Sequence, residues 1–300
     1  MMKTTLNLTF AVLASVTLLS LLEAAGKRET TTPPGKACIY KQSGGQPREM
    51  QVYFPLNHDP AKAKVPGLIL FHGGGWVGGD LSQFQFACHY FASRGLVAAT
   101  ANYQMLDKTA RPPAGESRKR VCVTDAKSAI RWFRQHAGEL GIDPARIITG
   151  GGSAGGHISV LATTNPGLSD PADPKEVDPS VSAYLLFNPA FSPEDRQDAE
   201  VDALRHIKAS FAPAIVFFGD QDNWQKGWGA VHARLQSLGC SGIDVQIAPH
   251  QKHGFYRQGP WSVVTLIAAD RFLVQQGFLT GEPTLAPPST GEKFVPAPAK

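Results

Sequence analysis

Short, continuous runs of apolar residues alternate along this chain with longer stretches in which apolar residues recur every three or four positions. Runs of the first kind predict strands buried on both faces, and stretches of the second kind predict amphipathic helices. The predicted strands lie at residues 67–72, 96–101, 146–149, 184–187, 214–218 and 245–247. The predicted helices lie at residues 81–93, 118–140, 154–162, 199–209, 228–238 and 261–276.

Two further short segments, residues 37–40 and 49–54, precede this alternation and predict an antiparallel pair with a turn at Gly44-Gly45. Regular alternation of strand and helix is typical of an α/β fold, with a mostly parallel central sheet and helices on both faces. We therefore expect one folded domain over residues 27–280.

The N-terminal segment predicts export. Lys3 provides a positive start, residues 6–22 are mostly apolar, and Ala24-Ala25-Gly26 places small residues where a signal peptidase cleaves. Residues 1–26 are thus interpreted as a secretory signal peptide, with an uncleaved membrane anchor as the alternative. We expect a secreted or periplasmic protein without stable membrane insertion after cleavage.

The opposite end, residues 281–300, is rich in proline, glycine, threonine and serine, and this composition predicts a disordered tail. Four cysteines, Cys38, Cys88, Cys122 and Cys240, allow three pairings if the protein is exported. Burial as small hydrophobic side chains is the alternative.

Charge gives little indication of a polyanionic partner. The formal net charge is +4, and the densest basic run, Arg118-Lys119-Arg120, has no interleaved aromatic residues. We interpret this run as a solvated loop face and expect no nucleic-acid partner.

The first candidate for chemistry is Ser153, in the segment Gly151-Gly152-Ser153-Ala154-Gly155. This segment matches G-x-S-x-G and lies between a predicted strand and a predicted helix, as a nucleophile elbow requires. A serine on so tight a turn projects its hydroxyl from the sheet edge, and the next helix N-terminus faces the charge that develops on attack. A glycine-rich phosphate loop is the alternative.

A second glycine-rich segment, His72-Gly73-Gly74-Gly75-Trp76, follows the strand that ends near residue 71. Consecutive glycines let backbone amides approach a ligand closely, so the amides of Gly74, Gly75 and Ala154 are the predicted oxyanion hole. The loop lacks the Lys-Ser/Thr of a phosphate-binding P-loop. We interpret His72 as structural.

A serine needs a base, and the base needs an acid that orients it. Asp220 and Asp222 both follow the strand at 214–218, and we prefer Asp222 because it lies further around the turn. His250 and His253 both follow the strand at 245–247, and we prefer His253 because Gly254 allows a tight turn beside it. A metal site at the two histidines is the alternative, but no cysteine or carboxylate cluster accompanies them. The order Ser, Asp, His is that of α/β-hydrolases.

Together these segments resemble the α/β-hydrolase-3 esterases, which include hormone-sensitive-lipase-like carboxylesterases and secreted feruloyl and acetyl-xylan esterases. The resemblance extends over about residues 50–278 and includes Arg131-Trp132-Phe133 and residues 141–144. The hormone-sensitive-lipase branch usually has Asp where this chain has Gly152, and it carries an N-terminal cap. The family usually has Tyr-Arg where this chain has Tyr103-Gln104.

The resemblance implies an α/β-hydrolase fold without a large cap domain. It also implies a serine carboxylic-ester hydrolase that acts on short acyl esters, including acetyl or feruloyl groups on polysaccharide, and needs no cofactor or metal. The expected partner is a small-molecule or polysaccharide ester, and the oligomeric state is left open. The alternatives are a prolyl-oligopeptidase-like peptidase and a non-catalytic binding protein on a hydrolase scaffold.

Overall fold

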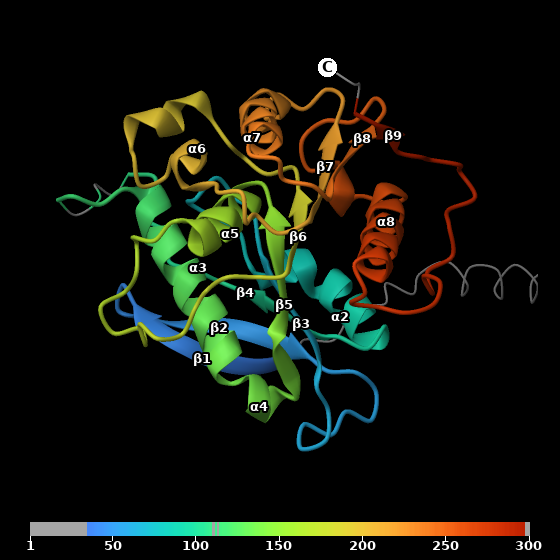
Figure 1. Ribbon diagram of the computed structural model, residues 1–300, viewed down its shortest axis with the longest axis horizontal. Helices are drawn as coiled ribbons and strands as arrows, with labels where there is room; N and C mark the ends of the chain where they lie inside the picture. Colours follow the sequence, from blue (N-terminus) through green and yellow to red (C-terminus); the bar gives the residue numbers. More distant parts are fainter. Residues whose placement is uncertain (1–34, 110–111, 113, 298–300) are drawn as a thin grey trace, which may run out of the picture. The chain divides into compact units, whose positions relative to one another are not determined.

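A nine-stranded sheet runs through the described part of the chain, residues 35–109, 112 and 114–297, in this computed structural model (Figure 1). The predicted signal peptide lies outside the described residues. The strand order is β1-β2-β4-β3-β5-β6-β7-β8-β9, with β3 to β8 parallel and β1, β2 and β9 antiparallel to their neighbours. The strands are β1 (Lys36–Ser43), β2 (Gln46–Tyr53), β3 (Val65–Phe71), β4 (Val97–Ala101), β5 (Ile142–Gly152), β6 (Ala183–Phe187), β7 (Ala214–Gly219), β8 (Ile243–Ala248) and β9 (Val295–Pro296).

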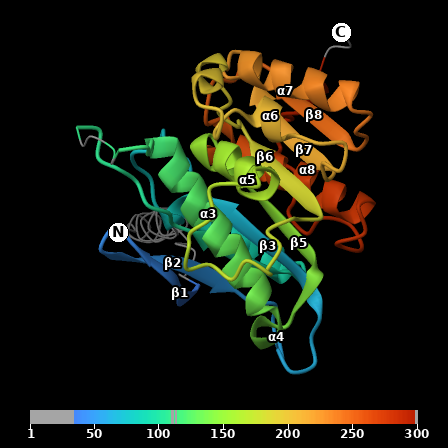
Figure 2. The same cartoon turned by 60° about the vertical axis from the view of Figure 1, so that its left-hand side comes forward.

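Helices cover both faces of this sheet. Figures 1 and 2 show α3, α5 and α7 on one side and α2 and α8 on the other. The helices are η1 (Leu81–Phe84), α2 (Gln85–Ser93), α3 (Arg118–Gln135), α4 (Ala137–Leu140), α5 (Ala154–Thr164), η2 (Pro193–Gln197), α6 (Ala203–His206), α7 (Gln225–Ser237), η3 (Phe255–Arg257) and α8 (Trp261–Gln275). The α/β-hydrolase architecture expected from the sequence is confirmed.

Two separate cores explain why the central strands are mostly apolar. Along β3, Leu68 and Leu70 pack in the core beneath α2 and α8, whereas Ile69 and Phe71 pack in the core beneath α3 and α5. Since successive side chains of a strand point to opposite faces, each residue of a doubly covered strand is buried. The continuous apolar runs in the sequence therefore result from a sheet that helices cover on both faces.

Two predicted helices differ in the structure. The stretch predicted as one helix over residues 118–140 divides at His136 into α3 and α4, and Gly141 then adopts a left-handed conformation with φ 69°. The helix predicted over residues 199–209 is a single turn, α6, because Asp202 caps it and the chain leaves the helical conformation at Ile207. Local apolar spacing therefore located these helices but not their ends.

The C-terminal segment differs from the disordered tail that its composition predicted. After α8 the chain runs back along that helix, and β9 pairs with the edge of β8 (Figure 1). Phe294 packs against three aromatic rings, with centroid distances of 5.2 Å to Phe217, 6.1 Å to Phe255 and 5.2 Å to Trp261. One aromatic anchor and a short edge pairing thus hold a segment whose proline content suits it to an edge position.

The described residues form one structural unit, and no segment between two described strands folds as a separate cap. Across the ranges that the structure describes, no helix has the length and apolar character needed to span a membrane. All four cysteines are unpaired in the structure, and Cys88 and Cys122 are fully buried in the two cores. The structure therefore favours burial of cysteines as small hydrophobic side chains over disulfide pairing.

Replacing Phe294 should measure how strongly the C-terminal segment is anchored. We expect Phe294→Ala to lower the free energy of unfolding by about 2 kcal/mol, because a half-buried ring loses three aromatic neighbours. The exposed neighbour Lys293 supplies the control, and Lys293→Ala should change stability by less than about 0.5 kcal/mol. Equal denaturant midpoints for the two variants would show that the segment adds no stability.

Candidate active site

The turn between β5 and α5 holds Ser153 in a strained backbone conformation. Its φ is 52° and its ψ is −116°, a region that residues with a side chain rarely adopt. The Ser153 amide donates to the carbonyl of Phe187 at 2.9 Å, and the Ser153 carbonyl accepts from Ala190 at 3.0 Å. The neighbouring strand β6 and the residues after it therefore keep the turn in this conformation.

The following glycine is required by close packing. A Cβ on Gly155 would lie 2.0 Å from the carbonyl oxygen of Phe71, at the end of β3. The first turn of α5 can approach the sheet this closely only without a side chain at this position. Ser153 consequently emerges at the carboxyl edge of the sheet, where the loops after β3, β7 and β8 also converge.

The structure brings together the three residues proposed from the sequence as nucleophile, acid and base. His253 Nε2 lies 2.8 Å from Ser153 Oγ, and His253 Nδ1 lies 2.8 Å from Asp222 Oδ2. An ionised carboxylate only accepts hydrogen bonds, so Nδ1 carries the proton and donates to Asp222. This tautomer leaves the lone pair of Nε2 directed at the serine hydroxyl.

The acid and the base differ sharply in burial. The side chain of Asp222 is fully buried, whereas that of His253 is 36% exposed. Besides His253, Asp222 accepts hydrogen bonds from Asn188 Nδ2 at 3.0 Å and from the amide of Trp224 at 3.0 Å. Every charged oxygen of the buried carboxylate therefore has a donor, which compensates the cost of removing it from water.

Asn188 is a site residue that the sequence reasoning missed. It lies fully buried just after β6, and its Oδ1 accepts from the amide of Gly254 at 3.2 Å while its Nδ2 donates to Asp222. One carboxamide thus holds the acid and the loop of the base in register. The sequence feature that could have identified Asn188 is its position directly after the apolar run at 184–187. A polar residue there lies at the carboxyl edge of a parallel sheet, where ligands bind.

The competing residues do not reach the serine. Asp220 is exposed, and among the described residues its side chain accepts no hydrogen bond, although its amide donates to Ala248 at 3.1 Å. His250 is also exposed and makes no hydrogen bond to Ser153 or Asp222. Within the described ranges, no group of three or more His, Cys, Asp or Glu side chains is arranged to hold a metal ion.

The predicted oxyanion loop lies against the serine. A Cβ on Gly73 would come within 3.1 Å of the Ser153 Cβ, and the Gly74 carbonyl accepts from the amide of Gly78 at 3.1 Å. The amides of Gly74 and Gly75 donate to no acceptor in the part of the chain that the structure describes. These amides, with that of Ala154 at the start of α5, are the donors available to a negative oxygen beside Ser153.

His72 has the structural role expected for it. The ring is fully buried, stacks on Tyr103 with a centroid distance of 4.4 Å, and its Nδ1 lies 2.9 Å from the Gly73 carbonyl. Burial lowers the pKa of His72, so the ring is neutral near neutral pH. It supports the oxyanion loop from below.

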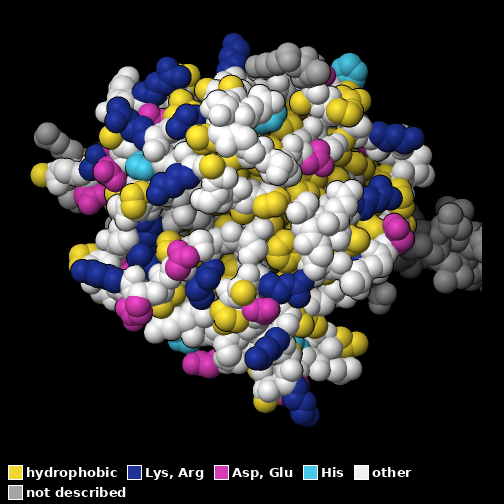
Figure 3. Space-filling view, in the orientation of Figure 1, with side chains coloured by type: hydrophobic (Ala, Val, Ile, Leu, Met, Phe, Trp, Pro, Cys, Tyr) yellow, Lys and Arg dark blue, Asp and Glu magenta, His cyan; other side chains and the backbone are white. Residues whose placement is uncertain are grey.

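The basic run Arg118-Lys119-Arg120 was predicted as a solvated loop, but it forms the half-buried first turn of α3. Arg120 pairs with Asp198 at 2.6 Å, Lys119 pairs with Asp195, and Arg118 donates to the Lys108 carbonyl at 2.7 Å. On the face shown in Figure 3, basic and acidic side chains are likewise interspersed. These charges stabilise the fold locally.

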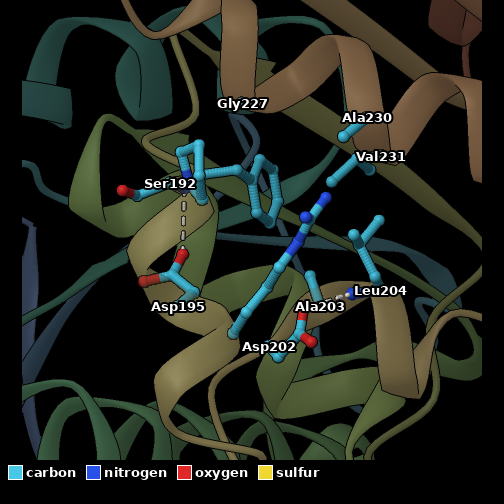
Figure 4. Close-up of a pocket in the computed structure, with 11 residues that line it drawn as sticks. Ser192, Asp195, Asp202, Ala203, Leu204, Gly227, Ala230 and Val231 are labelled. Atoms are coloured by element: carbon cyan, nitrogen blue, oxygen red, sulfur yellow. Dashed lines mark hydrogen bonds between the residues drawn. The ribbon is translucent and has the colours of Figure 1, made fainter.

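Asp195 also borders a small cavity of about 30 Å³ between η2, α6 and α7 (Figure 4). In this view the Ser192 amide donates to Asp195 Oδ2 at 3.0 Å, which closes the N-terminal turn of η2. None of Ser153, Asp222 and His253 lines the cavity. It is therefore a packing gap beside the site and not the place where the three residues act.

A hydrogen-bonded pair, Gln83 and Tyr256, lies beneath the elbow and was also missed by the sequence reasoning. Gln83 Nε2 donates to the Tyr256 hydroxyl, which is buried against Gly152. A Cβ on Gly152 would lie 1.8 Å from that hydroxyl oxygen. The Tyr256 hydroxyl therefore occupies the space that a side chain at residue 152 would need.

Comparison with known proteins gives consistent similarities. The BD-FAE family model matches residues 50–175. An ethyl acetate hydrolase of Pseudomonas putida is 29% identical over 243 residues, which cover 72% of this chain and 73% of that protein. Esterase LipI of Mycobacterium tuberculosis is 31% identical over 112 residues, 37% of this chain, and the match spans only about a third (32%) of its own length.

Among solved structures, esterase 2 of Thermogutta terrifontis in its apo form has a TM-score of 0.74 and 31% sequence identity. The match covers 85% of this chain and 100% of that chain. The same esterase phosphorylated by paraoxon matches with a TM-score of 0.74 and 32% identity, over 85% of this chain and 100% of that chain. The similarity therefore extends over most of this chain.

A methyl group at residue 152 should be poorly tolerated. We expect Gly152→Ala to lower the free energy of unfolding by about 1–3 kcal/mol, because its Cβ would overlap the Tyr256 hydroxyl. Gly138 in α4 has no neighbour near its would-be Cβ, so Gly138→Ala should be neutral or stabilising by up to about 1 kcal/mol. Chemical denaturation of both variants tests this, and equal effects would contradict the packing described here.

Proposed function

The chain belongs to the α/β-hydrolase-3 family of esterases, and from this premise we propose that it hydrolyses carboxylic esters by a serine acyl-enzyme mechanism. Ser153 is the nucleophile, His253 the general base and Asp222 the acid that orients the imidazole. The observation that carries the proposal is the pair of 2.8 Å contacts that His253 makes, one to Ser153 Oγ and one to Asp222 Oδ2.

In the first step, Ser153 Oγ attacks the ester carbonyl carbon as its proton passes to His253 Nε2. The carbonyl π electrons move to the oxygen, and the amides of Gly74, Gly75 and Ala154 stabilise the resulting negative charge. Asp222 stabilises the imidazolium that forms. Collapse of the intermediate breaks the bond to the alcohol oxygen, which leaves with the proton from His253.

Water completes the cycle. His253 removes a proton from a water molecule, whose oxygen attacks the acyl carbon bound to Ser153. A second tetrahedral intermediate then breaks the bond to Ser153 Oγ, which regains its proton, and the carboxylic acid is released. Phosphorylation of the Thermogutta terrifontis esterase by paraoxon supports a comparably nucleophilic serine in this chain. These steps require no cofactor.

The acyl group in this proposal is short. No cap covers the site within the described residues, and the base is partly exposed to solvent, so carbons beyond the first few would remain in water. The Thermogutta terrifontis esterase has been solved with propionate and with butyrate bound, which supports this size class. Acetyl or feruloyl groups on polysaccharide are the proposed natural esters, since the apolar segment at residues 6–22 predicts export.

The mechanism is tested by removing its nucleophile and its base. With p-nitrophenyl acetate, Ser153→Ala and His253→Ala should each lower kcat at least about 10³-fold, because proton transfer and attack act as a unit. His250 lies on the same exposed loop without contact to Ser153, so His250→Ala should keep wild-type turnover. Wild-type turnover in Ser153→Ala, or failure of a fluorophosphonate probe to label Ser153, would remove the proposal.

The substrate class is tested with a series of p-nitrophenyl esters together with acetylated xylan and methyl ferulate. We expect kcat/KM to peak at two to four acyl carbons and to gain nothing from longer chains. If an apolar tunnel buried the chain, each further methylene would add about 0.8 kcal/mol of binding, roughly fourfold in kcat/KM. A steady rise through eight or more carbons would contradict the open site.

A further inference from the structure

The side chain of Gln83 connects the oxyanion loop to the loop that carries the base. Gln83 belongs to η1, which is separated from the oxyanion loop by four residues, and its Oε1 accepts from the Gly73 amide at 2.8 Å. Its Nε2 donates to the hydroxyl of Tyr256 on η3, three residues after His253. One carboxamide therefore spans the two segments that must face the same reacting carbonyl.

The directions of these two hydrogen bonds are fixed by chemistry. The Gly73 amide can only donate, so the carboxamide oxygen of Gln83 must face it, and the carboxamide nitrogen must then face Tyr256. Flipping the carboxamide would place two donors against each other at Gly73. The bridge consequently has a single low-energy arrangement.

The receiving end of the bridge is held rigidly. The Tyr256 ring lies nearly parallel to Phe84, 6.0 Å between centroids at 12°, and 5.2 Å from the ring of Phe187. Its hydroxyl rests against Gly152, which leaves no space for displacement toward the elbow. Burial raises the pKa of Tyr256, so the hydroxyl remains protonated at working pH.

Of the three glycine amides in the oxyanion loop, that of Gly73 is the one that donates to an acceptor within the described residues. Gly74 and Gly75 donate to no acceptor within the described residues, and the Gly73 amide is held by Gln83. Rotation of the peptide between Gly73 and Gly74 would turn the Gly74 amide away from the serine. Transition-state stabilisation by a backbone donor depends on placement within a few tenths of an ångström.

We propose that Gln83 and Tyr256 are positioning residues, whose hydrogen bond keeps the oxyanion loop in register with His253 across the elbow. This inference rests on the proposed function. Tyr256 acts only through Gln83, and Gly152 is the residue that admits its hydroxyl. The pair thus occupies the space that a larger residue before the serine would need.

Three variants test the bridge with p-nitrophenyl acetate, with rates expressed per active site titrated by a fluorophosphonate. Gln83→Met removes both hydrogen bonds and should lower kcat about 10- to 100-fold, within the range for a misplaced oxyanion donor, with KM changed less than about threefold. Tyr256→Phe keeps the stacked ring and should lower kcat less. The double variant should be no worse than Gln83→Met, because Tyr256 acts through Gln83.

Gln85 offers a matched control. It lies two residues further along, is half-buried like Gln83, and donates its own side-chain hydrogen bond to Gln51 at 2.8 Å, away from the site. Gln85→Met should leave kcat and KM unchanged. The rate constant for phosphonylation should fall in parallel with kcat in Gln83→Met, since that reaction also places a negative oxygen in the hole.

An unchanged kcat per titrated site in Gln83→Met would overturn the inference, as would an effect on KM alone or losses that add in the double variant. Loss of folded protein lowers the titre without altering the rate per site, so a merely structural role is separated from a positioning role. Ester hydrolysis that survives in Ser153→Ala defeats the proposed function itself. Ser153-dependent hydrolysis with a fully active Gln83→Met defeats only the bridge.

Discussion

The short hydrogen bonds on both sides of His253 impose the constraint on which the rest of the structure depends. A ring that must contact Ser153 on one side and Asp222 on the other, each at 2.8 Å, can occupy only one position and one orientation. The three residues come from turns after different strands, so their strands must end at the same edge. A parallel sheet meets this requirement because all of its carboxyl ends lie together.

The surrounding groups serve mainly to prevent this arrangement from relaxing. The strained backbone of Ser153 persists because β6 binds its amide and the residues after β6 bind its carbonyl. Asn188 binds both Asp222 and the amide after His253, so the acid and the base cannot separate without breaking a buried contact. Such fully satisfied polar groups specify one geometry, because any alternative leaves a buried donor or acceptor unpaired.

The C-terminal segment and the first turn of α3 show how composition and local pattern can mislead. Residues 281–297 have the proline-rich composition of a flexible end, yet β9 pairs with β8, the strand that leads into the loop of His253, and Phe294 packs against Phe217 and Phe255. Likewise, the charged turn at the start of α3 has the composition of an exposed loop, but Asp195 and Asp198 pair with it. In both cases the partners lie more than 30 residues away in the chain, beyond the reach of a local sequence pattern.

The sequence by itself determined the architecture, Ser153 and the glycine loop, and it limited the acid to Asp220 or Asp222 and the base to His250 or His253. Each is marked locally, by apolar periodicity, by runs of glycine, or by position just after a strand. Tertiary structure alone decided which aspartate and which histidine meet the serine, and it alone revealed Asn188, Gln83 and Tyr256. The physical reason is that a hydrogen bond between distant loops depends on ångström-scale positions, which follow from the packing of the whole sheet and leave no periodic trace in the chain.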